Sequence, residues 1–241
     1  MKYSIRIAFY LILCILFLSV PENVRSQQVY LDGSEELLNT FRLDRNITQF
    51  ETLTYASIDG NPFLYENFAP GRIVLNTGET HRLDLRYDIY AGQIQFKNKE
   101  KVYEVVNPDK MSLIVIDTIS FQYTNYLKSP GDKTPEGSSF LILSTDGKCK
   151  LLVKKNMRIQ DAEVPKAYQE AQPAKFIPTG DTYYLQLEKN FAVRVNSKKE
   201  LLNILADKKD ELNKFIDSNK LGTKDLDDLV KIVTFYNSLY D

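Results

Sequence analysis

The chain has 241 residues, of which 43% are hydrophobic and 26% are charged, and these values are ordinary for a globular protein. Its 31 basic and 32 acidic side chains leave a formal net charge of −1. The composition therefore provides no basic field that would favour nucleic acid or an anionic lipid surface as a partner.

Residues 1–26 have the pattern of a secretory signal peptide, with two basic residues followed by an apolar run over residues 7–20. As a helix this run would span about 21 Å, whereas the hydrocarbon core of a bilayer is about 30 Å thick. Small residues at the −3 and −1 positions predict cleavage after Ser26, so that an exported protein begins at Gln27 and is periplasmic or extracellular. An uncleaved membrane anchor and a buried core helix are the alternatives.

Cys14 lies within the signal peptide, so Cys149 is the single cysteine of the expected mature chain. No intramolecular disulfide can form, and the fold must depend on its hydrophobic core. Removal of three basic residues and one acidic residue changes the formal charge from −1 to −3. The lack of disulfides favours a bacterial periplasm or outer surface over a eukaryotic secreted module.

After an N-terminal segment at 27–51, which includes a possible short helix beginning at Ser34, the pattern changes to period two. This alternation is typical of half-buried strands. The clearest strand places one set of side chains in the core, namely Leu83, Leu85, Tyr87 and Ile89. The opposite set is a ladder of alternating charge that would face solvent, namely Arg82, Asp84, Arg86 and Asp88.

A turn at Ala91 and Gly92 predicts a hairpin in which the next strand again alternates. Its inward residues would be Ile94 and Phe96, and its outward residues Gln93, Gln95 and Lys97. Further strands are expected at 72–75, 102–106, 113–117 and 119–123. Short strands separated by frequent turn signals indicate an antiparallel sheet.

Two more hairpins are predicted. The first, over 140–153, would turn at Asp146 and Gly147 and pair Ser144 with Cys149, Ile142 with Leu151, and Phe140 with Val153, with Cys149 pointing into the core. The second, over 183–195, would pair Leu185 with Val193 across a loop at 188–190. A connector over 160–180, with Pro165, Pro173 and Pro178, would join them. We therefore expect an antiparallel β-rich domain, a sandwich or partial barrel, over residues 52–195.

Helical patterns begin after Asn196. Ser197 and Glu200 form a capping box for the first helix, and Asp207 is expected to cap a second helix that ends near Asn219. Gly222 and Thr223 would break the chain and recap it for a third helix, with Thr223 as the capping residue. The apolar stripe expected on that helix consists of Leu226, Leu229, Val230, Val233, Tyr236 and Tyr240. The predicted fold class is α+β, with a C-terminal tail of three helices over 196–241.

The runs at 60–64, 85–90 and 93–97, together with the helical tail from Lys198 to Leu239, resemble an uncharacterised family of secreted cell-envelope proteins of Bacteroidota-type bacteria. The resemblance covers most of the expected mature chain. It implies an envelope location in a Gram-negative cell, and it carries no activity and no functional residues over to this chain.

Candidate chemistry is sparse. The single histidine, His81, would have to serve any Ser-His-Asp or Cys-His arrangement, and it is expected at the surface or in a turn. One histidine and one cysteine make a typical zinc site improbable, and no glycine-rich phosphate loop is present. Cys149 is expected to be a core residue rather than a nucleophile. We therefore assign no catalytic, cofactor-binding or metal-binding residue and expect no cofactor.

Two carboxylate pairs have a spacing that a glycosidase could use, Asp84 with Asp88 and Glu100 with Glu104. Such pairs arise by chance among 32 acidic residues. The 15 tyrosines and 13 phenylalanines could include a platform for sugar or peptide, although core packing explains most of them. The charge ladder could likewise recognise a partner or simply be a solvated sheet face.

These patterns favour an exported, non-enzymatic envelope protein with a binding or structural role and a partner or ligand that the sequence does not name. One alternative is a carboxylate-dependent hydrolase acting on envelope glycan or peptide. Another is an adaptor that docks a partner through an exposed apolar face of the helical tail. We expect no nucleic-acid partner and no stable membrane insertion once the signal peptide is removed.

Overall fold

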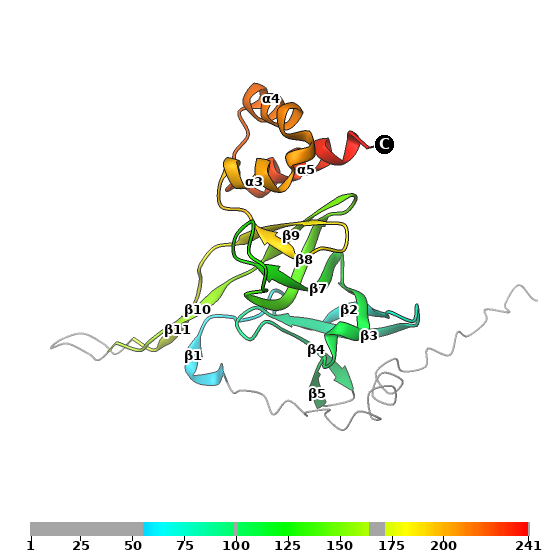
Figure 1. Ribbon diagram of the computed structural model, residues 1–241. Helices are drawn as coiled ribbons and strands as arrows, with labels where there is room; N and C mark the ends of the chain where they lie inside the picture. The colour runs from blue at the N-terminus through cyan, green and yellow to red at the C-terminus, as the bar shows by residue number, and fades with distance from the viewer. Residues whose placement is uncertain (1–54, 99–100, 164–171, 241) are drawn as a thin grey trace, which may run out of the picture. The chain divides into compact units, whose positions relative to one another are not determined.

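The computed structural model describes residues 55–98, 101–163 and 172–240, which belong to one compact unit (Figure 1). The signal peptide, the segment at 27–51, Glu100 and Pro165 lie outside the described residues. Strands precede three C-terminal α-helices, which confirms the α+β class (Figure 1).

Ten strands form one sheet in the order β13-β12-β9-β8-β7-β6-β2-β3-β4-β5 within the described part of the chain. Their bounds are β2 (Ala69–Leu75), β3 (Thr80–Asp88), β4 (Gln93–Asn98), β5 (Lys101–Glu104), β6 (Met111–Ile116), β7 (Ile119–Leu127), β8 (Gly137–Thr145), β9 (Cys149–Lys154), β12 (Thr182–Leu187) and β13 (Ala192–Arg194). A smaller sheet has the order β1-β11-β10, with β1 (Ile58–Asp59), β10 (Met157–Gln160) and β11 (Ala174–Pro178). Single 3-10 turns lie at η1 (Tyr55–Ser57), η2 (Pro108–Lys110) and η3 (Ala206–Lys208).

The large sheet closes on itself at one end, because β13 pairs with β12 and also, in parallel, with β7. The ring β7-β8-β9-β12-β13 encloses Leu141, Leu152, Tyr184 and Ala192, all of which are buried. This closure forms a partial barrel, one of the two architectures predicted from the sequence. A second cluster contains buried side chains of β2, β3, β4 and β6 together with Phe121 of β7 and Phe140 of β8.

The β3–β4 hairpin agrees with its predicted turn, and its register pairs Leu85 with Phe96 and Tyr87 with Ile94. Three placements on this hairpin were wrong. Asp88 and Gln95, predicted to face solvent, are 0% and 1% exposed, and His81, predicted at the surface, is 1% exposed. His81 lies on the same face of β3 as the core residues Leu83 and Leu85. Asp88 and Gln95 lie on the opposite face, which the chain segment at 62–68 covers.

The β8–β9 hairpin exists, but its predicted register was wrong. Ile142 pairs with Val153 rather than with Leu151, and a bulge between Leu143 and Thr145 shifts the pairing so that Thr145 faces Leu151. Before the bulge the register is shifted by two residues from the predicted one, which preserves the face of each side chain. Cys149 is buried, as predicted.

The β12–β13 hairpin has the predicted pairing of Leu185 with Val193. The expected connector at 160–180 needs correction, because strand β11 lies within it and pairs with β10 from Met157 opposite Pro178 to Gln160 opposite Lys175. Pro178 is compatible with this position because β1 pairs only with Ala174 and Lys175 of β11, so that one side of the strand at Pro178 has no ladder partner among the described strands.

The helices are α3 (Lys198–Ile204), α4 (Lys209–Asn219) and α5 (Leu226–Ser238). In the predicted capping box, the amide of Glu200 donates to Ser197 Oγ at 3.3 Å, while the Glu200 carboxylate accepts from the amide of Asn196 at 2.8 Å. Two predicted caps were wrong. Asp207 makes no capping hydrogen bond to α4, and Asp225 rather than Thr223 caps α5, accepting from the amide of Asp228.

One face of α5 packs into a cluster with α3, α4 and the outer side of β9 and β12. The buried residues of α5 are Leu229, Ile232, Val233 and Tyr236, so the predicted stripe needs Ile232 added, whereas Tyr240 is 39% exposed. The hydroxyls of Tyr236 and Tyr240 both donate to Asp207. The Asp207 carboxylate therefore binds these two tyrosines instead of capping α4. None of the described helices is long and apolar enough to cross a membrane.

Candidate functional site

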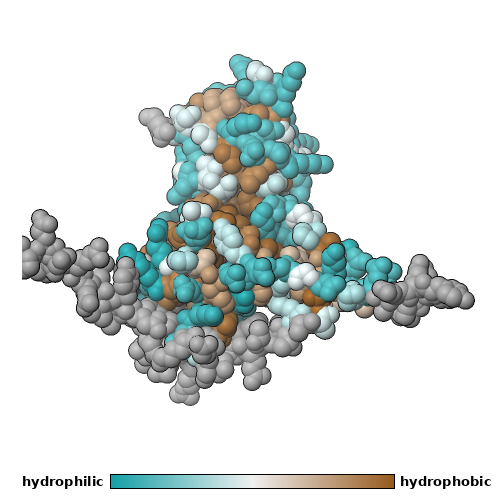
Figure 2. All heavy atoms as spheres, turned by 180° about the vertical axis from the view of Figure 1, so that it is seen from behind, coloured by the Kyte–Doolittle hydropathy of each residue, from teal (hydrophilic) through white to brown (hydrophobic). Residues whose placement is uncertain are grey.

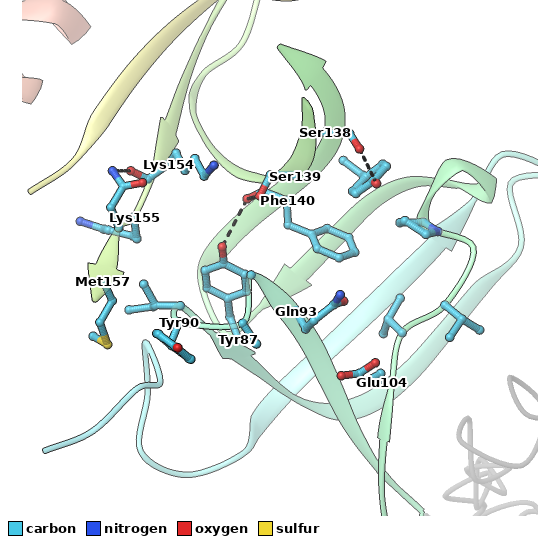
Figure 3. Close-up of a pocket in the computed structure, with 18 of the residues that line it drawn as sticks. Tyr87, Tyr90, Gln93, Glu104, Ser138, Ser139, Phe140, Lys154, Lys155 and Met157 are labelled. Carbon is cyan, nitrogen blue, oxygen red and sulfur yellow. Dashed lines mark hydrogen bonds between the residues drawn. The ribbon is translucent and has the colours of Figure 1, made fainter. Parts of the chain in front are cut away.

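A cavity of about 580 Å³ lies where five chain segments meet. They are the β3–β4 turn at 89–93 with Tyr87 before it, the stretch 104–108 at the end of β5, Tyr123 of β7, the start of β8 at 138–140, and residues 154–157 from the end of β9 to the start of β10 (Figure 3). The volume falls within the range of roughly 300–1,000 Å³ that is usual for small-molecule pockets.

Aromatic side chains from three strands form one wall of the cavity. The Tyr87 hydroxyl donates to the carbonyl of Phe140 at 3.5 Å, and the hydroxyls of Tyr123 and Ser138 are 2.7 Å apart (Figure 3). The rings of Tyr123 and Phe140 meet edge to face with centroids 5.0 Å apart. These contacts fix the wall before any ligand binds, and burial raises the pKa of Tyr87, so its hydroxyl stays protonated.

Asp88 holds the β3–β4 turn that forms the rim. Its carboxylate accepts from the amide of Ala91 at 2.9 Å and from the Tyr55 hydroxyl at 2.8 Å. Burial raises the pKa of Asp88 although both hydrogen bonds oppose this shift. Gly92 has a φ of 68°, a left-handed conformation that glycine adopts without strain, and this lets the turn close.

Glu104 is the only acid among the described residues that line the cavity. It lies opposite Gln95 in the β4–β5 register, at the end of β5. Burial raises the pKa of the Glu104 carboxyl, and the negative charge of Asp88 raises it further. The two carboxylates therefore lie close enough to interact, and Glu104 is the one that borders the cavity.

The two lysines of the lining direct their charges to other partners. Lys154 Nζ donates to the Tyr126 hydroxyl at 2.9 Å, and Lys155 Nζ pairs with the Asp181 carboxylate at 2.7 Å. In Figure 3 they lie on the side away from Glu104. The amide of Asn156 donates to the Gly180 carbonyl at 2.9 Å and so fixes the loop rather than the cavity. The lining thus has its lysines on one side and its single acid, Glu104, on the other.

Tyr90 extends the aromatic surface beyond the rim. It is 42% exposed, and its ring packs edge-on against Tyr55 and Phe176, with centroids 6.1 Å and 5.4 Å away. Exposed large hydrophobic side chains are few among the described residues, and Figure 2 shows apolar side chains interspersed with hydrophilic ones on the face it displays. Tyr90 is therefore an exposed ring that is held in place at the mouth of a cavity.

Most residues that the sequence singled out lie elsewhere. His81 is buried in β3, with Nε2 at 3.2 Å from Glu79 Oε1, and Cys149 is buried against the helices. Asp84 is exposed and lies outside the cavity lining, so it does not form a cavity pair with Asp88. Of the three candidate carboxylates that the structure describes, Asp84, Asp88 and Glu104, only Glu104 lines the cavity. No cluster of three metal-ligating side chains occurs in the described part of the chain.

Sequence reasoning missed the aromatic and polar lining. Residues such as Tyr90, Gln93 and Ser139 carry no motif, and they come together only because strands far apart in sequence meet. The one local signal was the turn at Ala91 and Gly92. Comparison with protein-family models, curated proteins and solved structures finds no match to this chain.

Proposed function

We propose that this protein is an exported envelope protein that binds a small ligand in the cavity and does not transform it. The observation that carries the proposal is the cavity itself: it has a pre-formed aromatic wall, several hydroxyl and amide groups, and one acid, Glu104. Pockets that combine apolar walls with a few polar groups are typical of small-molecule sites.

The hydrolase alternative requires a second carboxylate at the reacting bond. A glycosidase needs two carboxyl groups about 5–10 Å apart that both reach the substrate. The nearby Asp88 is 0% exposed, and hydrogen bonds to Tyr55 and Ala91 occupy its carboxylate. With only Glu104 facing the cavity among the described lining, binding is the better-supported function.

The adaptor alternative requires an exposed apolar face on the helical tail. The residues that would supply it, Leu229, Val233 and Tyr236, are at most 1% exposed, because they pack against the outer side of β9 and β12. Their burial favours a structural role for the tail.

Export is the second part of the proposal, and it rests on the signal-peptide pattern of residues 1–26. Expression of the full chain in a Gram-negative host should release a protein whose intact mass corresponds to a chain beginning at Gln27. Recovery of the uncleaved chain in the membrane fraction would overturn this part.

The binding function is tested by blocking the cavity. Val106 lines the cavity and is half-buried, so Val106→Trp should fill the space. Thr118→Trp is the matched control, because Thr118 is exposed in the turn between β6 and β7 and lies outside the lining. Both variants and the wild type would be incubated with small-molecule extract of bacterial envelopes, washed, and analysed by mass spectrometry of the retained compounds.

We expect the wild type and Thr118→Trp to retain the same compound and Val106→Trp to lose it. Circular dichroism before incubation would confirm that each variant is folded. Equal retention by all three proteins, or retention by none, would contradict the cavity as the binding site.

A further inference from the structure

We infer that the ligand carries a cationic amino group, which binds beside Glu104 within the aromatic cavity. This inference rests on the proposed binding function and adds the chemical class of the ligand. Its basis is the set of charged groups around the cavity, their hydrogen-bond partners, and the acceptors and rings that a ligand can contact.

Glu104 has one acid and two lysines in its surroundings. On β3, which β4 separates from β5, the carboxylate of Asp88 adds a second negative charge that acts on Glu104. Across the cavity, the ammonium groups of Lys154 and Lys155 are bound to Tyr126 and Asp181. Lys154 keeps its charge because Tyr126 is neutral, but neither lysine forms an ion pair with Glu104. The carboxylate therefore has no counter-charge within the lining, and an ammonium group of the ligand would supply one.

Arg86 of β3 is a further cation of this hairpin. Its guanidinium donates from Nε and Nη2 to Gln95 Oε1 at 3.3 and 2.8 Å, and Nη1 donates to the Glu66 carbonyl at 3.4 Å. The same group lies 3.5 Å from the ring centroid of Phe63. Arg86 is thus held on the outer face of the hairpin, and it does not line the cavity.

The cavity contains several acceptors that could bind an ammonium group. An ammonium has three donors and no acceptor. The lining offers the Glu104 carboxylate, the Gln93 side-chain carbonyl and the Ser138 and Ser139 hydroxyl oxygens as acceptors. A neutral ligand could use some of these groups, but it would leave the half-buried carboxylate of Glu104 without a counter-charge.

The ring of Tyr90 forms an aromatic rim of the cavity. Cations bind favourably to the faces of tyrosine rings within about 6 Å, and this attraction increases when water is excluded. Tyr90 is exposed at the rim and held by Tyr55 and Phe176. The tyrosines and the carboxylate together form a pocket that favours a cation with an apolar or sugar-like body.

An amine of this kind could belong to an amino sugar or to a lysine side chain, and paired probes distinguish the two sources. One pair is glucosamine and glucose; the other is Nα-acetyl-lysine amide and Nα-acetyl-norleucine amide. Binding would be measured by NMR chemical-shift titration of the protein from Gln27 to Asp241, for the wild type, Glu104→Gln, and the control Asp84→Asn. Asp84 is an exposed acid of β3 outside the lining, so its loss changes the net charge equally.

We expect one amine probe to bind the wild type and Asp84→Asn about tenfold or more tightly than its neutral analogue, since a hydrogen-bonded charge pair has about this effect on affinity. Glu104→Gln should lose this preference while its thermal midpoint stays at or above that of the wild type. Saturation with glucosamine alone indicates an amino sugar, and saturation with the lysine derivative alone indicates a peptide or amino-acid source.

Two results overturn the inference. Equal binding of an amine and its neutral analogue removes the role of the charge but leaves the cavity as a binding site. Failure of all four probes to shift cavity resonances rejects the amine class. The retention experiment with Val106→Trp then decides the proposed function separately.

Discussion

Asn237 provides the sharpest test of how the helical tail is attached to the barrel. Its side-chain Oδ1 accepts from the amide of Cys149 at 2.8 Å, and its Nδ2 donates to the carbonyls of Cys149 and Asp146 at 2.9 and 3.2 Å. One asparagine of α5 thus completes the backbone hydrogen bonding of the β8–β9 hairpin. Replacing it by alanine removes all three contacts at once.

The size of the effect follows from these contacts. Each hydrogen bond contributes about 0.5–1.5 kcal/mol net, so three contribute about 1.5–4.5 kcal/mol. Alanine gains roughly 0.5 kcal/mol of helix propensity over asparagine, which partly offsets the loss. We expect Asn237→Ala to lower the free energy of unfolding by about 1–4 kcal/mol.

The matched control is Asn219→Ala, because Asn219 is an exposed asparagine of α4 that donates only to the Phe215 carbonyl of its own helix. Its replacement should change stability by no more than about 0.5 kcal/mol. Urea unfolding followed by circular dichroism measures both variants, with equal slopes confirming that the same surface is exposed. If Asn237→Ala unfolds at the same urea concentration as Asn219→Ala, the tail does not depend on this asparagine.

Three further outcomes can be measured on the same protein. Val233 is 0% exposed in the helix–barrel cluster, so Val233→Asp should lower the free energy of unfolding by roughly 3 kcal/mol or more; an unchanged thermal midpoint would mean that this face of α5 is not buried. Burial raises the pKa of the Cys149 thiol to about 12, so a thiol reagent at pH 8 should label it only after denaturation, and rapid labelling of native protein would place it at the surface. The raised pKa of Glu104 means that its contribution to stability is complete below its ordinary pKa of about 4.3 and is lost as pH rises through the folded-state value. Glu104→Gln should therefore flatten the fall in unfolding free energy above about pH 4, and a curve parallel to that of the wild type would show that the carboxylate is not perturbed.

The period-two pattern was a good guide to strands because side-chain alternation directly encodes which face is buried. It identified the β12–β13 pairing of Leu185 with Val193, where a short loop leaves little choice of register. It did not predict the register of β8 and β9, because the bulge between Leu143 and Thr145 leaves no trace in the alternation of apolar residues. Local pattern determines the face, whereas loop and bulge geometry determine the partner.

The same pattern failed where another segment covers the outer face. The amide of Leu64 donates to the Tyr87 carbonyl at 3.0 Å, and the amide of Ile89 donates to the Pro62 carbonyl at 2.8 Å. This segment lies against β3 and helps to bury Asp88, which alternation had placed in solvent. The cavity was not predicted for a related reason, because its lining comes from five segments that only the tertiary fold brings together.

Gly71 is required by the close approach of strands β2 and β6, which the sequence pattern does not reveal. Gly71 lies within β2 rather than in a turn, and a Cβ there would come within 2.4 Å of the Val115 carbonyl oxygen and 2.7 Å of Leu85 Cδ1. A backbone oxygen of the neighbouring strand cannot move aside without disturbing the β2–β6 pairing. Gly71→Ala should therefore cost about 1–3 kcal/mol, as overpacking of a core typically does.

Gly222→Ala is the matched control for Gly71→Ala, because a Cβ at Gly222 would lie no closer than 3.6 Å to the nearest atom, Asp228 Oδ2, and its φ is not positive. The same added methyl group should there be neutral or stabilise the fold by up to about 1 kcal/mol, since it restricts the unfolded chain. Thermal and urea unfolding of the two variants separate the loss of glycine as a residue type from the steric clash in the sheet. Equal stability of Gly71→Ala and Gly222→Ala would mean that β2 and β6 are not packed as closely as the β2–β6 register requires.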